Sequence, residues 1–225
     1  MKKNKYIEIF DGLFKKNPLF VSGFIIAPVV ACCYSLKNAL LLIFVFSVMT
    51  FLTVLISTFI PRNFVYTLRI ILYTAIASVV FVPIYGVAVQ IFGERVDTFG
   101  FFLPLLVTNS MISLQSELIF YKMPKIKMIA SVFFYIVGFD MAVVIFSVIR
   151  ELLAFGTIFD KVAFTGLNID LFSMTCGGFI LLGLVCGVYR RILIFVKEHN
   201  DIDIIDKETA LAELSEAEDI LEEML

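Results

Sequence analysis

The chain has 225 residues, of which 60% are hydrophobic and only 17% are charged, and its mean hydropathy is +0.99. Because a soluble domain needs a polar exterior, this composition excludes a soluble protein and indicates an integral membrane protein surrounded by lipid. The net charge of -2, with half of the 20 acidic residues after position 200, argues against nucleic acid as a partner.

Six apolar runs predict transmembrane helices and hence an all-α integral membrane fold, because about 20 apolar residues are needed to cross a bilayer. The runs cover residues 18–36, 39–60, 70–92, 99–120, 128–149 and 172–196. The second, third and fifth runs are regular. The first is interrupted by Pro28 and the fourth by Pro104, which is followed by a group of polar residues.

These runs divide the chain into three parts. Residues 1–17 form a basic, amphipathic amino terminus, residues 18–198 the membrane domain, and residues 199–225 an acidic tail. Leucines recur in the tail at helical spacing, which favours an amphipathic helix that binds a protein partner; a solvated tail is the alternative. The basic start and the sequence VVAC at 29–32 also resemble a cleaved lipoprotein signal, but five further spans make a lipid anchor redundant, so we expect the segment to be retained.

The distribution of Lys and Arg predicts the orientation. With six crossings, both termini and the second and fourth loops share one side of the membrane, and all but four of the 18 Lys and Arg residues lie there. The exceptions are Lys37, Arg95, Arg150 and Lys161. Positive residues accumulate on the cytoplasmic side, so we expect both termini to be cytoplasmic.

The six spans form two sets of three, each beginning with a proline-interrupted segment. Three spans per half invert the second half, so the pattern predicts two inverted three-helix repeats with broken first and fourth helices. Broken helices are tolerated in hydrocarbon only where protein or a cavity surrounds them, so Pro28, Pro104 and Asn109 mark a candidate functional centre. The alternative is that the prolines only kink ordinary helices.

Three motifs resemble a known family. They are NPLF at 17–20 followed by AP at 27–28, FLPLLVTNS at 102–110, and IRELLAFGTIF at 149–159. Over about residues 5–198 the chain is similar to the small six-helix proteins of the Rnf and Na+-translocating NADH:quinone oxidoreductase (Nqr) complexes, and within them to the RnfE and NqrD type. The resemblance implies a bacterial plasma (inner) membrane location, a pseudo-symmetric A-type partner subunit, other Rnf/Nqr subunits, and electron transfer coupled to Na+ or H+ translocation.

The resemblance also implies a cofactor site. In the family, each of two subunits contributes two cysteines to a shared 2Fe-2S cluster, one before the proline of the first broken helix and one after the asparagine of the fourth span. Here those positions hold Ala27 and Ser110. Alanine cannot ligate iron and serine is a poor substitute for a thiolate, so we expect this chain alone to bind no cluster. Cys32 and Cys33 lie about 7–9 Å farther along a helix, too far to replace the missing ligands.

Two acidic residues lie within predicted spans. Asp140 stands in the middle of the fifth span, where an ionisable side chain costs about 2.5–3.5 kcal/mol to insert, so it is either a carboxylate on an ion path or a hydrogen-bonded structural contact. Glu117, near the cytoplasmic end of the fourth span, is a second ion-path candidate and could instead pair with a lysine or a partner subunit. Arg150 and Glu151, at the external end of the fifth span, are expected to be interfacial anchors.

These residues assemble neither a catalytic group nor a metal site. The sequence has no nucleotide-binding glycine motif, and its one histidine is His199. We therefore expect a non-catalytic membrane subunit of a redox-driven ion translocase, without its own half of the cluster site. The alternative is a paralogue recruited as a non-redox membrane transporter or as the scaffold of another assembly.

Overall fold

A computed structural model describes residues 13, 17–23, 25–61, 64–109, 111–112, 124–159, 161–162 and 169–196. The chain divides into two compact units, Met1–Val185 and Cys186–Leu225. The described elements of the first unit are α2 (Ile26–Cys32), α3 (Leu36–Ser57), α4 (Tyr66–Phe92), α5 (Arg95–Phe99), α6 (Phe102–Leu105), η1 (Leu106–Thr108), α8 (Lys125–Phe155), β1 (Thr157–Ile158), β2 (Lys161–Val162) and α9 (Asp170–Ser173). A further helix, Thr175–Val196, begins in the first unit and ends in the second.

Four helices of the described residues are long and apolar enough to cross a membrane: α3, α4, α8 and Thr175–Val196. They correspond to the second, third, fifth and sixth predicted spans, so the prediction of a multi-pass helical membrane protein is confirmed. Apart from Leu36, which begins α3, and Phe99, which ends α5, the helices that the described residues form within 18–36 and 99–120 are short, namely α2, α6 and η1. Six crossings and an inverted repeat therefore stay predictions.

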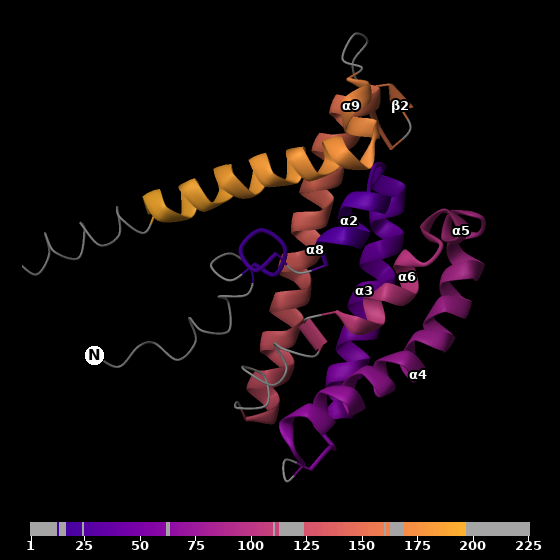
Figure 1. The fold of residues 1–225 in the computed structure, drawn as a ribbon, viewed down its shortest axis with the longest axis vertical. Helices are drawn as coiled ribbons and strands as arrows, with labels where there is room; N and C mark the ends of the chain where they lie inside the picture. Colours follow the sequence, from indigo (N-terminus) through magenta and orange to yellow (C-terminus); the bar gives the residue numbers. More distant parts are fainter. Residues whose placement is uncertain are drawn as a thin grey trace, which may run out of the picture. The chain divides into compact units, whose positions relative to one another are not determined.

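The core of the first unit is built on α3, which packs against α4 and α8 (Figure 1). Half of the apolar stretch of α3 and of α8 is buried inside the protein, compared with 22% of that of α4. Between α3 and α8, the rings of Phe46 and Phe139 lie 4.1 Å apart at their centroids, and both side chains are fully buried. Aromatic packing of this kind fixes the two helices against each other.

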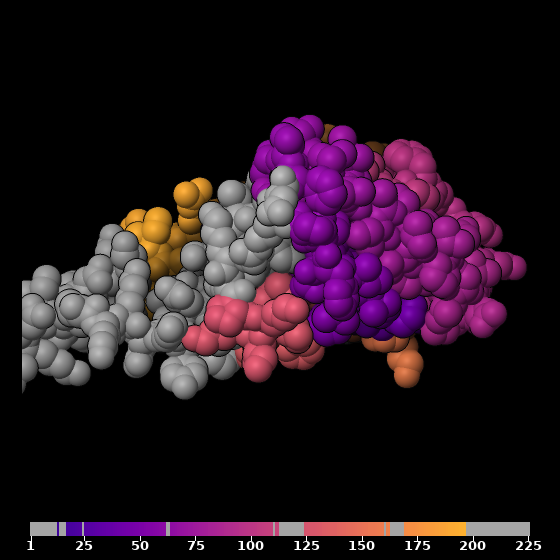
Figure 2. All heavy atoms as spheres, turned by 90° about the horizontal axis from the view of Figure 1, so that it is seen from below, coloured from indigo at the N-terminus to yellow at the C-terminus, as the bar shows by residue number. Residues whose placement is uncertain are grey.

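The outer face of α4 is apolar, and α4 forms one side of the first unit in Figure 2. Large hydrophobic side chains are exposed on this helix, as expected for a surface that contacts lipid rather than water. They include Leu68, Ile71, Val79, Val82, Val87, Val89 and Ile91.

Helix α8 is longer than the sequence predicts. The predicted span stops at residue 149 only because two charged residues follow; beyond them the chain is apolar again, and α8 continues to Phe155. It ends at Gly156, whose φ of 63° is the left-handed conformation that favours glycine at a helix terminus. Arg150 and Glu151 are therefore inside the helix, with exposed fractions of 0% and 1%. The prediction that they are interfacial anchors is wrong.

Candidate functional site within the membrane helices

The two predicted interruptions are the starts of short helices. Ile25 has a left-handed backbone with φ 61°, and α2 begins at the next residue. Pro28 is the third residue of α2, and Pro104 is likewise the third residue of α6. A backbone N–H in the first turn of a helix has no partner within that helix, so a proline there removes no helical hydrogen bond. The two short helices contact each other.

Asn17 closes the turn that precedes α2. Its side-chain oxygen accepts hydrogen bonds from the backbone N–H groups of Leu19 at 3.0 Å and Phe20 at 3.1 Å. Its amide donates to the carbonyl oxygen of Gly138 in the middle of α8, at 2.7 Å. Asn17 is 3% exposed. Because unpaired backbone groups are costly in hydrocarbon, this one side chain allows a non-helical turn to pack against a membrane helix.

Asn109 has a similar role at the end of η1, where the backbone becomes extended with φ -68° and ψ 144°. Its amide donates to the carbonyl oxygen of Leu106 at 2.8 Å, and its side-chain oxygen accepts from the N–H of Ile112 at 2.9 Å. The buried asparagine thus bonds to the backbone on both sides of the helix end. Ser110 and Glu117, the two neighbouring candidates, lie outside the described residues.

Ala27, the position that the resemblance assigns to a cluster ligand, is on the surface of the chain. Ala27 is exposed, whereas Pro28 beside it is buried. Cys32 and Cys33 are buried, with exposed fractions of 3% and 0%. The described residues hold no group of three or more His, Cys, Asp or Glu side chains that could bind a metal ion.

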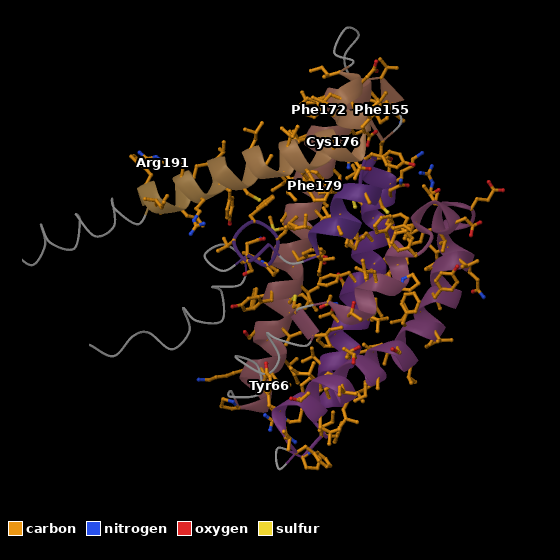
Figure 3. All side chains as sticks on the ribbon, in the orientation of Figure 1. Tyr66, Phe155, Phe172, Cys176, Phe179 and Arg191 are labelled. Atoms are coloured by element: carbon orange, nitrogen blue, oxygen red, sulfur yellow. The ribbon has the colours of Figure 1, made fainter. Side chains whose placement is uncertain are left out.

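Arg150 joins three segments that are distant in sequence. Its guanidinium donates to the carbonyl oxygens of Phe172 at 2.9 Å, Met174 at 3.1 Å and Ser173 at 3.5 Å, and also to that of Val30 in α2. Phe172 is labelled in Figure 3, in α9, which packs against α8. Carbonyl groups in the last turn of a helix lack partners within it and carry partial negative charge, so a buried cation stabilises the carboxyl ends of α2 and α9 together.

Glu151 has the complementary role at an amino terminus. Its carboxylate accepts a hydrogen bond from the N–H of Leu36, the first residue of α3, at 2.6 Å. Ser35 precedes α3 but makes no side-chain capping bond in the described structure, so Glu151 supplies the cap from another helix. The Thr157 hydroxyl donates to the same carboxylate at 3.3 Å. Two adjacent residues of α8 therefore stabilise different helix ends: Arg150 the carboxyl ends of α2 and α9, and Glu151 the amino end of α3.

Two glycines allow the last helix to approach this cluster. A Cβ atom on Gly178 would lie 2.8 Å from Cζ of Arg150 and 2.9 Å from Cγ1 of Val30. A Cβ atom on Gly177 would lie 1.9 Å from the carbonyl oxygen of Leu171, which is backbone and cannot move aside easily. Both positions require a residue without a side chain.

Asp140 lies earlier in α8 than Arg150 and makes a separate contact with α3. The hydroxyl of Ser47 in α3 lies 2.9 Å from one carboxylate oxygen of Asp140 and 2.8 Å from the other. The carboxylate is partly exposed at the edge of the contact between the two helices. Sequence reasoning identified Asp140 but not its partner, which is 93 residues away.

Together these features define a multi-pass membrane protein that combines long apolar helices with short helices, some of whose ends bond to buried polar side chains. Comparison with known proteins identifies the class more closely. The chain belongs to the Rnf-Nqr subunit family of membrane proteins, which it matches over residues 6–186. It is 27% identical over 211 residues to the E component of the ion-translocating oxidoreductase complex of Haemophilus influenzae strains PittEE and PittGG, covering 85% of this chain and 88% of each relative.

Proposed function

We propose that this chain is a membrane subunit of an Rnf/Nqr-type electron transport complex that couples electron transfer to Na+ or H+ translocation, and that it supplies no ligands to a 2Fe-2S cluster. Membership of the family over residues 6–186, combined with Ala27 at the exposed start of α2, carries the proposal. The two relatives are named as subunits of an ion-translocating complex, and the match covers most of their length.

The remaining cysteines favour the loss of the cluster site. Alanine has no donor atom, and a cluster shared between subunits needs thiolates at the surface where the subunits meet. Cys32 and Cys33 are buried instead, and buried thiols in apolar surroundings are usually inert. Cys176 is exposed, but it lies on the last helix rather than on α2 or α6.

The partner in this proposal is an A-type subunit that covers the start of α2. A small exposed side chain at Ala27 allows close approach of another helix, which is how membrane helices associate in the absence of a hydrophobic driving force. We further propose that the equivalent positions of Pro28 and Pro104 reflect an inverted repeat, with both termini in the cytoplasm of a bacterium.

Affinity purification from native membranes tests the proposal. The tagged full-length chain should bring down other subunits of the complex, and iron assays on the chain expressed alone should find no stoichiometric iron. If the chain is recovered from native membranes without other subunits, the subunit assignment is refuted, and the absence of a cysteine at Ala27 then favours a paralogue recruited as a transporter or scaffold. Stoichiometric iron in the chain alone would refute the second part.

A further inference from the structure

Asp140 and Ser47 bring three oxygen atoms together between α3 and α8. The Ser47 oxygen is almost equidistant from the two carboxylate oxygens, at 2.9 and 2.8 Å. A serine hydroxyl has one proton, so it can satisfy only one of the two carboxylate oxygens at a time. In a helix that crosses a membrane, the other oxygen needs a proton or a cation.

The hydrogen bonds between α3 and α8 show which residues of the two helices lie opposite each other. Leu36 of α3 bonds to Glu151 of α8, and Ser47 bonds to Asp140; each pair of positions is eleven residues apart, from 36 to 47 and from 140 to 151. The helices are therefore antiparallel and in constant register. The part of α3 that follows Ser47 runs beside the part of α8 that leads back to Lys125.

A row of buried hydroxyl groups occupies that part of α3. Thr50, Thr53 and Ser57 recur at helical spacing on the stripe that contains Phe46, which packs on α8. The register places Ser57 opposite residue 130, next to the buried Ser131 of α8. The row consists of Thr50, Thr53, Ser57 and Ser131, whose exposed fractions are 0%, 0%, 2% and 0%.

Within the described part of the chain, none of these four hydroxyl groups has a hydrogen-bond partner. Hydroxyl groups in membrane helices usually bond to a carbonyl one turn back, as Thr74 and Ser78 do in α4, at 2.9 Å each. Four unsatisfied hydroxyl groups in one row are unusual, since each costs about 1–3 kcal/mol when buried without a partner. Thr50, Thr53 and Ser57 share one face of α3, and this face points to a polar species that they serve.

We propose that Asp140 and Ser47 bind a sodium ion, which reaches them along the row of hydroxyl groups from the Lys125 end of α8. One carboxylate with neutral oxygen ligands balances a single positive charge, whereas a divalent cation would leave an unpaired charge in hydrocarbon. A bound proton needs only one acceptor oxygen, whereas a sodium ion needs several oxygen ligands, which Ser47 and the neighbouring unpartnered hydroxyl groups can supply. The inference deepens the proposed function, because it names residues of the ion path, but the binding site stands on the geometry of this chain alone.

Labelling of Asp140 by dicyclohexylcarbodiimide tests the proposal. The reagent modifies protonated carboxyl groups in membranes, so a bound cation protects them. In vesicles containing the full-length chain with its accompanying subunits, the rate of modification of the Asp140 peptide is measured by mass spectrometry in sodium chloride or choline chloride of equal concentration. Sodium at ten times its dissociation constant should slow labelling by about elevenfold, and choline should not.

Variants of the ligands make the test specific. Ser47→Ala should raise the sodium concentration for half-protection by about tenfold, and Thr50→Val should raise it less. Thr74→Val, which removes a hydroxyl group already bonded to its own helix, is the matched control and should leave protection unchanged. Ser47→Ala and Thr50→Val keep the Asp140 carboxylate, so its labelling rate can be measured in both variants. The test therefore does not depend on whether an Asp140→Asn variant inserts into the membrane.

Equal labelling rates in sodium and choline would overturn the proposal, as would a wild-type Asp140 that is never labelled. Unchanged protection in Ser47→Ala would overturn the assignment of Ser47 as a ligand. The labelling result is independent of the affinity purification that tests for a complex. Sodium protection of Asp140 in a chain that purifies without other subunits would uphold the sodium site and refute the subunit assignment.

Discussion

Replacing Arg150 by Met should destabilise the first unit strongly. The substitution keeps the length and apolar stem of the side chain but removes every donor of the guanidinium. The carbonyl oxygens of Phe172, Met174 and Val30 then lose partners inside the protein, and the contact with Ser173 at 3.5 Å adds little. Three bonds to a charged donor are worth about 1.5–3 kcal/mol each, and removing the buried guanidinium recovers part of its desolvation cost, so the net loss is about 3–5 kcal/mol.

Reversible unfolding in mixed detergent micelles measures this free energy. Sodium dodecyl sulfate is titrated into the folded protein, and the loss of helix is followed by far-ultraviolet circular dichroism. Arg150→Lys should fall between wild type and Arg150→Met, because an ammonium group keeps the charge but has three donors instead of the five in the planar guanidinium.

Arg95→Met provides the matched control. Arg95 is partly exposed, and its contact with the side-chain oxygen of Asn38 is long, at 3.5 Å. Its loss should change the free energy of unfolding by less than about 1 kcal/mol. If Arg150→Met changes stability no more than Arg95→Met does, the reasoning that Arg150 stabilises the two helix ends is refuted.

Three further predictions concern the last helix, the turn before α2 and the orientation. Gly177→Ala should reduce the yield of folded protein on gel filtration, because its Cβ atom would clash with the Leu171 carbonyl group. Gly183→Ala is the control: its Cβ atom would have no atom within 4 Å, so the change should be neutral or slightly stabilising. Equal yields of the two variants would contradict the close approach at Gly177. Asn17→Ala should lower the free energy of unfolding by about 1–2 kcal/mol in the same titration, since the turn loses its cap and its bond to α8; an unchanged value would show that the turn holds without it. A reporter enzyme that is active only in the cytoplasm, fused after Leu225, should be active. Activity of a reporter that works only outside the cytoplasm, fused at the same place, would refute the predicted orientation.

The long helices could be predicted because each is a continuous apolar run. Composition and hydropathy identified α3, α4, α8 and Thr175–Val196, and the structure confirms all four. The ends were less accurate. Arg150 and Glu151 looked like the polar end of a span because their partners, Val30 and Leu36, are 120 and 115 residues away. The available signal was the return of apolar residues immediately after them, followed by Gly156.

Sequence reasoning located Asp140, because a carboxylate in an apolar run stands out on its own. It did not reveal Ser47 or the neighbouring row, since serine and threonine are common in membrane helices and their meaning depends on which face meets α8. Similarly, Pro28 and Pro104 indicated interruptions, but the sequence did not show that they lie in the first turns of α2 and α6. The turn that precedes α2 is held by the bond from Asn17 to Gly138, which is 121 residues away.

The bonds of Arg150 also constrain the order in which the protein is made. One of its partners, Val30, belongs to a segment synthesised long before α8, and the others, Phe172 to Met174, leave the ribosome only after α8 is complete. Until then, the guanidinium on α8 has only a few of its final acceptors, and a charged side chain without partners is costly in a membrane. We therefore expect α8 to remain beside the insertion machinery until the last helix is synthesised, so that insertion of these two helices is a single event.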